Sequence, residues 1–188
     1  MSGQRPATDV AVHWRTLAHA DRSLEGVLDA VELERIARLE RPADRGRSLV
    51  AAATLRTVAA ARLGIAPAAV RVDRTCDACG RQHGAPRLLH EDAPWVSVSH
   101  SGVLIAVVLA GAPVGIDVQR LADLPEREDG HAWVRAEAVA KAEGVARSAG
   151  HPLGRLATYE LVAPLAGYAA ALALPVASGT PHVTASGP

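Results

Sequence analysis

The chain has 188 residues, of which 49% are hydrophobic and 21% charged, as in an ordinary globular protein. The formal net charge is zero, so whole-chain electrostatics give no reason to expect a nucleic-acid partner. No stretch approaches 18 uninterrupted apolar residues, and the N-terminus shows no apolar signal-peptide core. We therefore expect a cytoplasmic protein without a membrane segment, and a monomer.

The first half of the chain predicts a strand and two helices, followed by a turn and a second strand within residues 65–73. Residues 8–14 are expected to form a short opening strand. Asp29 and Glu32 make a D-x-x-E capping pattern at the start of a first helix. A second helix follows Pro42, with apolar residues at helical spacing, and Gly64 is expected to end it.

Three strands are expected after residues 73–94, which are rich in Gly and Pro and predict a loop. The three strands are Trp95–Ser99, Val103–Ala110 and Pro113–Gln119. The second is apolar throughout, which predicts burial on both faces, whereas the first and third alternate. In the third strand, Asp117 and Gln119 share one face, opposite the apolar residues.

The remaining elements are a helix over residues 131–143, ended by Gly144, and a strand over residues 167–174. Residues 177–188 are expected to be a disordered tail. Helices before strands, followed by strands, a helix and a strand, predict an α+β fold made of two units rather than an alternating parallel-sheet fold.

Charge is distributed unevenly between the two halves of the chain. Residues 1–90 contain 14 Arg against 10 acidic residues, whereas residues 91–188 contain 6 basic against 10 acidic residues. This asymmetry suits a cleft that binds a polyanion on one wall and a metal on the other. A chance imbalance of this size is an equally good explanation.

A carboxylate and an amine share one face of the predicted helix over residues 131–143. Glu137 and Lys141 are four residues apart, and Lys141 is the single lysine of the chain. A compact ammonium differs from a guanidinium where a point charge must fit close to a phosphate. Asp117 and Gln119, together with Glu137, would make a hard-oxygen site suited to Mg²⁺. The alternative is an exposed salt bridge between Glu137 and Lys141.

Ser99 and His100 close an alternating strand and are expected to donate hydrogen bonds to a phosphate. A serine hydrolase is excluded, because neighbouring strand residues point to opposite faces and the chain has no G-x-S-x-G motif. The chain also lacks a Walker loop, a G-x-G-x-x-G motif and an H-E-x-x-H motif.

Cys76, Cys79 and His83 form a C-x2-C-x3-H array within the predicted loop. Three ligands fall short of the four that a structural zinc needs, and the spacing of His90 as a fourth is not diagnostic. A zinc site and a loop with reduced cysteines both stay open.

Taken together and in order, these segments resemble the Sfp-type 4′-phosphopantetheinyl transferases. The matching segments cover about residues 30–144: Arg47 and Arg56 in the second helix, His83-Gly84-x-Pro86, Ser97-Val98-Ser99-His100-Ser101-Gly102, Gly115-Ile116-Asp117-Val118, and Trp133-x3-Glu137-Ala138-x2-Lys141.

The resemblance implies two similar α/β halves with a pseudo-twofold relation, residues 1–93 with basic phosphate contacts and residues 94–176 with metal and catalytic residues. Coenzyme A would bind between them. The implied reaction is magnesium-dependent transfer of 4′-phosphopantetheine to a serine of an apo acyl or peptidyl carrier protein, with adenosine 3′,5′-bisphosphate leaving. Carriers of fatty acid, polyketide, peptide and siderophore assembly are all open.

Residue roles also follow from the resemblance. The implied magnesium ligands are Asp117, Gln119 and Glu137. Glu137 is also the implied base for the carrier serine, and Lys141 contacts phosphate. The implied coenzyme A ligands are Lys141, Gly84, Pro86 and, at the 3′-phosphate, Arg47, Ser99 and His100.

The chain departs from the family pattern in a few places. Gln119 replaces an acidic metal ligand, and Ala85 replaces a basic residue, which leaves Arg87 as a substitute phosphate contact. Ala136 stands where a basic residue is usual, with Arg135 one place earlier. Two alternatives stay open: a non-catalytic relative that binds coenzyme A or a carrier protein, and a small zinc-binding interaction module.

Overall fold

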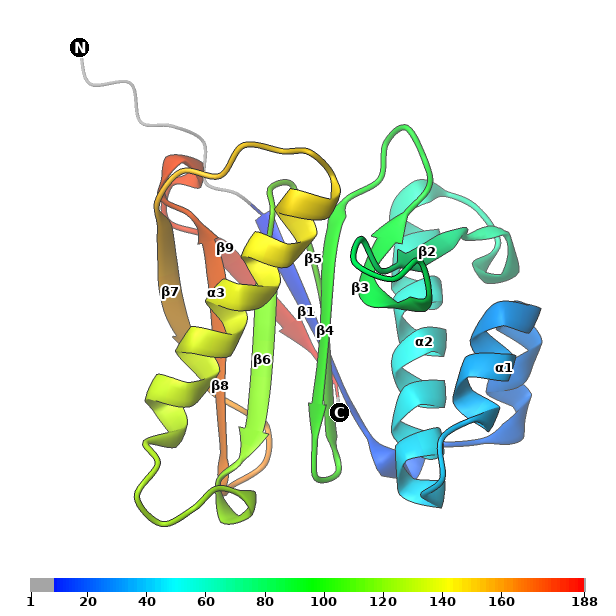
Figure 1. Cartoon of the computed structure of the whole chain (residues 1–188), viewed down its shortest axis with the longest axis horizontal. Coiled ribbons are helices and arrows are strands. Elements are labelled where there is room, and N and C mark those ends of the chain that lie inside the picture. The colour runs from blue at the N-terminus through cyan, green and yellow to red at the C-terminus, as the bar shows by residue number, and fades with distance from the viewer. Residues whose placement is uncertain (1–8, 188) are drawn as a thin grey trace.

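The computed structural model of the chain describes residues 9–187 and shows a mixed α+β architecture (Figure 1). Its α-helices are α1 (Ala30–Ala37), α2 (Pro42–Leu63) and α3 (Gly130–Ser148). Its strands are β1 (Asp9–Thr16), β2 (Val72–Thr75), β3 (Gln82–Leu88), β4 (Trp95–Ser101), β5 (Leu104–Ala110), β6 (Gly115–Arg120), β7 (Leu156–Leu161), β8 (Tyr168–Pro175) and β9 (His182–Ser186).

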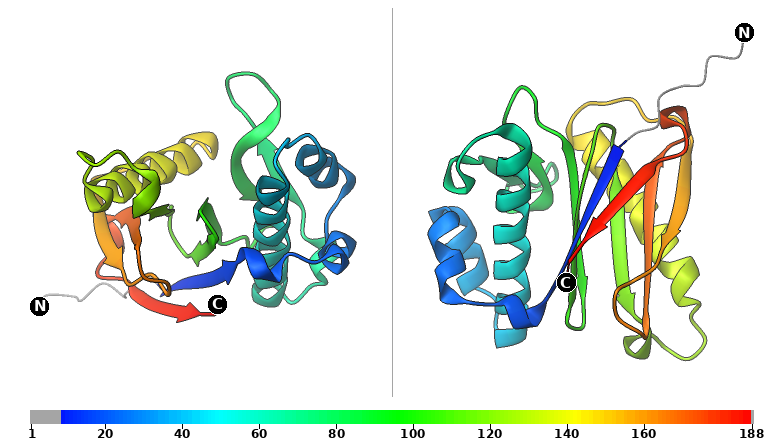
Figure 2. Two further views of the ribbon diagram at one scale, coloured as in Figure 1. Left: turned by 90° about the horizontal axis from the view of Figure 1, so that it is seen from below. Right: turned by 180° about the vertical axis from the view of Figure 1, so that it is seen from behind.

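Two sheets lie between two long helices. A four-stranded sheet has the order β4-β5-β1-β9, a three-stranded sheet has the order β6-β8-β7, and β2 and β3 form a separate hairpin. Helix α2 packs on the first sheet and α3 on the second, so the helices lie on the outer sides (Figures 1 and 2). The main hydrophobic core lies between the two sheets and joins side chains of β1, β5, β6 and β8.

Alternation along the strands explains this layering. In β5 the even-numbered residues from Leu104 to Ala110 enter the core between the sheets, whereas Ile105, Val107 and Leu109 pack with the side of α2. In β8 the even-numbered residues enter the same core, and the alanines between them pack against α3. Both strands are buried on both faces, as predicted for the apolar run that forms β5.

Serine side chains join the two sheets where β4 meets β6. Ser97 Oγ accepts a hydrogen bond from Ile116 N (3.2 Å), Ser99 Oγ from Val118 N (3.2 Å), and Ser101 Oγ from Arg120 N (3.0 Å). Because side chains two residues apart share a strand face, the alternation of β4 supplies an acceptor at every second residue. These hydroxyls satisfy backbone donors of β6 that would otherwise be unpaired at the junction.

The predicted start of the first helix and both predicted ends of the second helix are confirmed. Asp29 Oδ1 accepts from Glu32 N (2.9 Å), and the Glu32 side chain reaches back to Asp29 N, so the capping box is present. Helix α2 has Pro42 in its first turn and ends at Gly64, whose φ of 68° is readily adopted only by glycine. The predicted α+β class is also confirmed. The structure contains the opening strand over residues 9–14, the three strands expected between residues 95 and 119, and the strand over residues 167–174, although the first and last residues of these strands differ from those predicted.

The predicted loop over residues 73–94 is wrong in part, because it contains most of the β2–β3 hairpin. The hairpin pairs Val72 with Leu88, and its register shifts between Asp73 and Thr75. Pro86 lies within β3 and has no N–H to donate, a feature found in strands mainly at edges and bulges. A short, irregular ladder with an internal proline hides the alternation on which a strand prediction depends.

Two expectations for the C-terminal part are also wrong. Helix α3 continues through Gly144 to Ser148, because burial of Val145 and Ala146 outweighs the roughly 1 kcal/mol cost of a glycine in a helix. The predicted disordered tail contains β9, which pairs in parallel with β1 and places Val183 beside Val10. Residue 188 lies outside the described residues, as does residue 8 of the predicted opening strand.

The sheet order brings the two predicted halves of the chain together. Strand β1 pairs with β5 across the predicted boundary at residues 93 and 94. The division into two similar halves stays a prediction. No helix within residues 9–187 is long and apolar enough to cross a lipid bilayer.

Candidate functional site

A cavity of about 390 Å³ brings together most of the predicted site residues. It is lined by Arg35 of α1, Ser48 and Ala51 of α2, Arg74 of β2, Val98, Ser99 and His100 of β4, Asp117, Val118 and Gln119 of β6, and Trp133, Glu137 and Lys141 of α3. One side is therefore formed by the basic first half of the chain and the other by strand β6 and helix α3. Residues of both halves of the chain thus line the cavity, and the binding of a polyanion and a metal there stays a prediction.

Helix α3 reaches the cavity because residue 115 has no side chain. A Cβ at Gly115 would lie 1.9 Å from Ala138 O and 2.6 Å from Ala142 N, so only glycine permits this approach. The cavity side of α3 then carries Trp133, Glu137 and Lys141 at a spacing of four residues. The prediction that Glu137 and Lys141 share a helix face is confirmed.

Asp117 is the most densely bonded acidic group of the cavity. Its Oδ1 accepts hydrogen bonds from Ser99 Oγ (2.7 Å) and Lys141 Nζ (2.6 Å), and its side chain is 8% exposed. Lys141 Nζ also donates to Ile116 O (3.1 Å). The structure therefore pairs Lys141 with Asp117, not with Glu137, and fixes the ammonium at the cavity wall.

The oxygen ligands predicted for magnesium lie on the same wall. Asp117 and Glu137 offer carboxylates, and Gln119 is held through Nε2, which donates to Arg120 O (3.0 Å), so its Oε1 is left as an acceptor. This donor set fits Mg²⁺, which takes one or two carboxylates and completes its shell with phosphate oxygens and water. Because residue 119 is a glutamine, the carboxylates of this wall are those of Asp117 and Glu137.

Ser99 and His100 point in different directions, as expected for adjacent strand residues. Ser99 is buried, and its hydroxyl donates to Asp117 Oδ1 and accepts from Val118 N. Both hydrogen bonds of Ser99 therefore join β4 to β6. His100 is exposed at the cavity rim. Partial desolvation, followed by the positive charge of Arg47, lowers the pKa of His100, so the ring is mostly neutral at pH 7.

Two arginines on the opposite side of the cavity have hydrogen-bond donors without an acceptor within the described residues. Nε of Arg35 and Nε of Arg74 are buried and have no hydrogen-bond partner within the described residues. Desolvation and then the neighbouring charge of Arg35 lower the pKa of Arg74 to about 10, although Glu32 opposes the shift. Arg74 still carries its charge at pH 7, and its Nη1 donates only a long bond (3.4 Å) to Gly84 O. Unpaired buried donors on cations favour an anionic ligand.

Sequence analysis missed both of these arginines as site residues. Arg74 lies in the stretch that was predicted to be a loop, so no strand placed it at a cavity. The one signal available was the excess of arginine in residues 1–90, which indicates a charge but not a position.

Several predicted coenzyme A ligands lie outside the cavity lining. Arg47 donates to Gly102 O (2.7 Å) and pairs with Asp44, although its charge acts on His100 at the rim. Gly84 lies against the backbone of β2, where a Cβ would be 3.0 Å from Arg74 O, so it supports the strand that carries Arg74. Pro86 is buried within β3.

Arg87, the expected substitute phosphate contact, is also engaged elsewhere. It pairs with Asp73 and donates to Ser148 O at the end of α3. Ser148 Oγ in turn donates to Asp77 Oδ2 (2.6 Å). These contacts tie the β2–β3 hairpin to the helix that carries Glu137.

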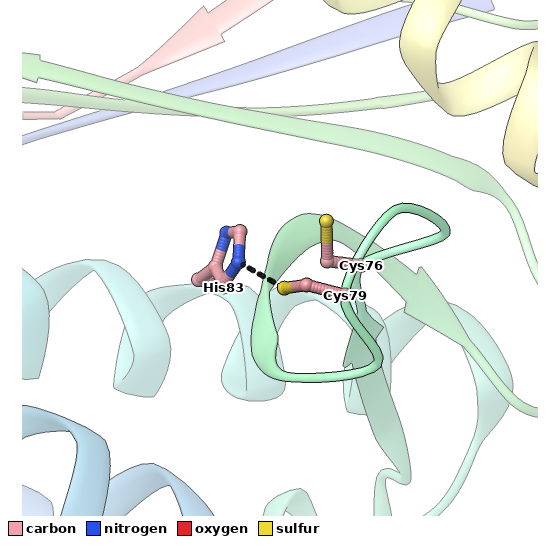
Figure 3. A group of neighbouring side chains, drawn as sticks. All are labelled: Cys76, Cys79 and His83. Carbon is pink, nitrogen blue, oxygen red and sulfur yellow. Dashed lines mark hydrogen bonds between the residues drawn. The ribbon is translucent and has the colours of Figure 1, made fainter.

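Cys76 and Cys79 lie in the turn between β2 and β3, and His83 lies at the start of β3 (Figure 3). The ligand atoms of Cys76, Cys79 and His83 all lie within 4.8 Å of one another, and Cys79 Sγ is 2.9 Å from His83 Nε2. Hydrogen bonds from Arg81 and then from His83 lower the pKa of Cys79 to about 6. The thiolate, which is the metal-binding form of cysteine, is therefore favoured at neutral pH.

Comparison with known proteins adds no family assignment. A scan against protein-family models and a search of curated proteins both found no match to this chain.

Proposed function

We propose that the chain is a 4′-phosphopantetheinyl transferase, which moves the phosphopantetheine arm of coenzyme A onto a serine of an acyl or peptidyl carrier protein. The observation that carries the proposal is that Asp117, Glu137 and Lys141 line the same cavity as Arg35 and Arg74. Coenzyme A is a polyanion with a reactive diphosphate, so its binding needs cations, and its cleavage needs charge neutralisation and a base. The cavity offers each of these groups.

The transfer is a displacement at phosphorus. The carrier serine Oγ forms a bond to the β-phosphorus, and the bond from that phosphorus to the oxygen bridging the two phosphates breaks. Adenosine 3′,5′-bisphosphate leaves with the electron pair. Glu137 takes the serine proton, and Lys141 neutralises phosphate charge from its fixed place beside Asp117.

Magnesium fits the oxygen donors of this wall. Asp117, Glu137 and Gln119 would hold the ion, and when bound it would neutralise charge on the pyrophosphate. On the opposite wall, the guanidinium groups of Arg35 and Arg74 line the cavity and receive phosphate oxygens. His100 and the nearby charge of Arg47 contribute to the same anion site from the rim.

Mass spectrometry of apo-carrier proteins incubated with the chain, coenzyme A and Mg²⁺ tests the proposal. Glu137→Gln should lower the transfer rate at least ~100-fold, because the base is lost. Glu143→Gln is the matched control, since Glu143 lies exposed on the same helix and outside the cavity.

Near-wild-type transfer by Glu137→Gln, or transfer that needs no added Mg²⁺ after chelation, would contradict the proposal. Binding of coenzyme A or a carrier protein without any transfer would instead identify a non-catalytic relative.

A further inference from the structure

We propose that Cys76, Cys79 and His83 form a binding site for Zn²⁺ that closes the turn between β2 and β3. The site is separate from the oxygen-lined cavity, and the inference holds whether or not the chain transfers phosphopantetheine. Within residues 9–187, these three side chains are the one group of three or more His, Cys, Asp or Glu residues with ligand atoms close enough to hold a metal ion.

The backbone of the turn presents both cysteines to one point. Cys76 N donates to Arg81 O (2.8 Å), while Cys79 N (3.3 Å) and Gly80 N (2.8 Å) both donate to Cys76 O. Gly80 has a φ of 71°, which reverses the chain directly after the second cysteine. The C-x2-C-G segment is thus a tight, hydrogen-bonded loop that precedes a strand, and His83 projects from the start of that strand.

The separations agree with a tetrahedral ion after a small adjustment. Zinc bonds of about 2.3 Å to sulfur and 2.0–2.1 Å to nitrogen place neighbouring ligand atoms roughly 3.5–3.8 Å apart. The ligand atoms here already lie within 4.8 Å of one another, and the 2.9 Å contact between Cys79 and His83 has only to lengthen slightly. Two thiolates and an imidazole are soft and borderline donors, which select zinc over the magnesium suited to the oxygen-lined cavity.

Three protein ligands leave the fourth position for water. The three side chains range from partly buried to exposed, and His83 lines a surface cavity of about 380 Å³ beside α1, which gives an ion access. His90 lies beyond the end of β3 and is not part of the cluster.

The position of the turn defines what the ion does. The turn directly follows β2, which carries Arg74, and Asp77 inside it accepts from Ser148 Oγ (2.6 Å) at the end of α3. An ion that fixes this turn holds the arginine side of the cavity in place relative to α3. The ion would therefore hold the hairpin turn through three protein ligands, and it makes no contact with the cavity itself.

Metal analysis of the full chain tests the site. After purification with thiol reductant and zinc, followed by gel filtration, we expect close to one zinc per chain. Cys79→Ser and His83→Ala should each lower that content at least tenfold, whereas the control His90→Ala should keep it. The chain has no cysteines other than Cys76 and Cys79, so thiolate signals have no other source.

Cobalt substitution tests the site in the wild-type chain and therefore does not depend on whether a variant folds. Wild-type chain stripped with chelator and loaded with Co²⁺ should show thiolate-to-cobalt charge transfer and the intense visible absorption of tetrahedral Co²⁺. Absence of that charge transfer, zinc below about a tenth of an equivalent in the wild type, or a Cys76–Cys79 disulfide after thiol trapping in freshly lysed cells would overturn the proposal.

Discussion

The oxygen-lined cavity and the cysteine turn differ in how their ligand atoms are brought together. The cavity takes side chains from α1 to α3, which lie far apart in the chain, and its donors are carboxylates, an amide, guanidinium groups and an ammonium. The turn takes its three ligands from residues 76–83 and offers sulfur and nitrogen. A local site depends on one loop conformation, whereas a dispersed site depends on the packing of several elements. Changes in packing should therefore alter the cavity first and leave the turn intact.

The strongest test of this contrast is Gly115→Ala. The added Cβ meets backbone atoms of α3, which cannot move as a flexible side chain does, so we expect a loss of unfolding free energy of about 3 kcal/mol. Displacement of α3 should also separate Glu137 and Lys141 from Asp117 and lower the transfer rate. Urea denaturation and the carrier-protein assay measure the two effects, and zinc content should stay unchanged.

Gly144→Ala is the matched control, because no atom lies within 4 Å of a Cβ at this position in the same helix. It should raise the unfolding free energy by about 0.5–1 kcal/mol. Equal stabilities of the two variants would show that α3 does not depend on the contact at Gly115.

Arg74→Gln should have the next largest effect. A charge-assisted hydrogen bond contributes about 1.5–3 kcal/mol, so KM for coenzyme A should rise roughly 10- to 150-fold with little change in kcat. Arg71→Gln serves as the control, since Arg71 is exposed just before the same strand and does not line the cavity. An unchanged KM in Arg74→Gln would place the anion site elsewhere.

The smallest expected effect concerns the serine junction between the sheets. Ser97→Ala leaves the buried Ile116 N–H without its side-chain acceptor and should cost about 1–2 kcal/mol of unfolding free energy. Ser101→Ala removes an equivalent bond to Arg120 N at the exposed end of the strand and should cost about 0.5 kcal/mol or less. If urea denaturation gave the same loss of unfolding free energy for both variants, the burial of the serine along the junction would not determine what its hydrogen bond contributes.

Local patterns in the sequence determined much of the fold and part of the site. The capping pair Asp29 and Glu32, the boundaries of α2 at Pro42 and Gly64, and the buried strand β5 depend on neighbouring residues, and all are confirmed. The same holds for the shared helix face of Glu137 and Lys141. The cysteine turn is also local, so its three candidate ligands were visible from spacing alone.

Only the tertiary structure decided which distant residues meet. Pairing of β9 with β1 joins strands from opposite ends of the described chain, and extension of α3 past Gly144 depends on burial against other elements. The partner of Lys141 is Asp117 on another element, not the nearby Glu137, because Gly115 lets the helix approach β6. Likewise, Arg74 faces the cavity through a hairpin whose alternation is hidden by a proline and a bulge. Side-chain periodicity encodes which face of an element is apolar, whereas contacts between elements depend on the shapes and distances that packing imposes.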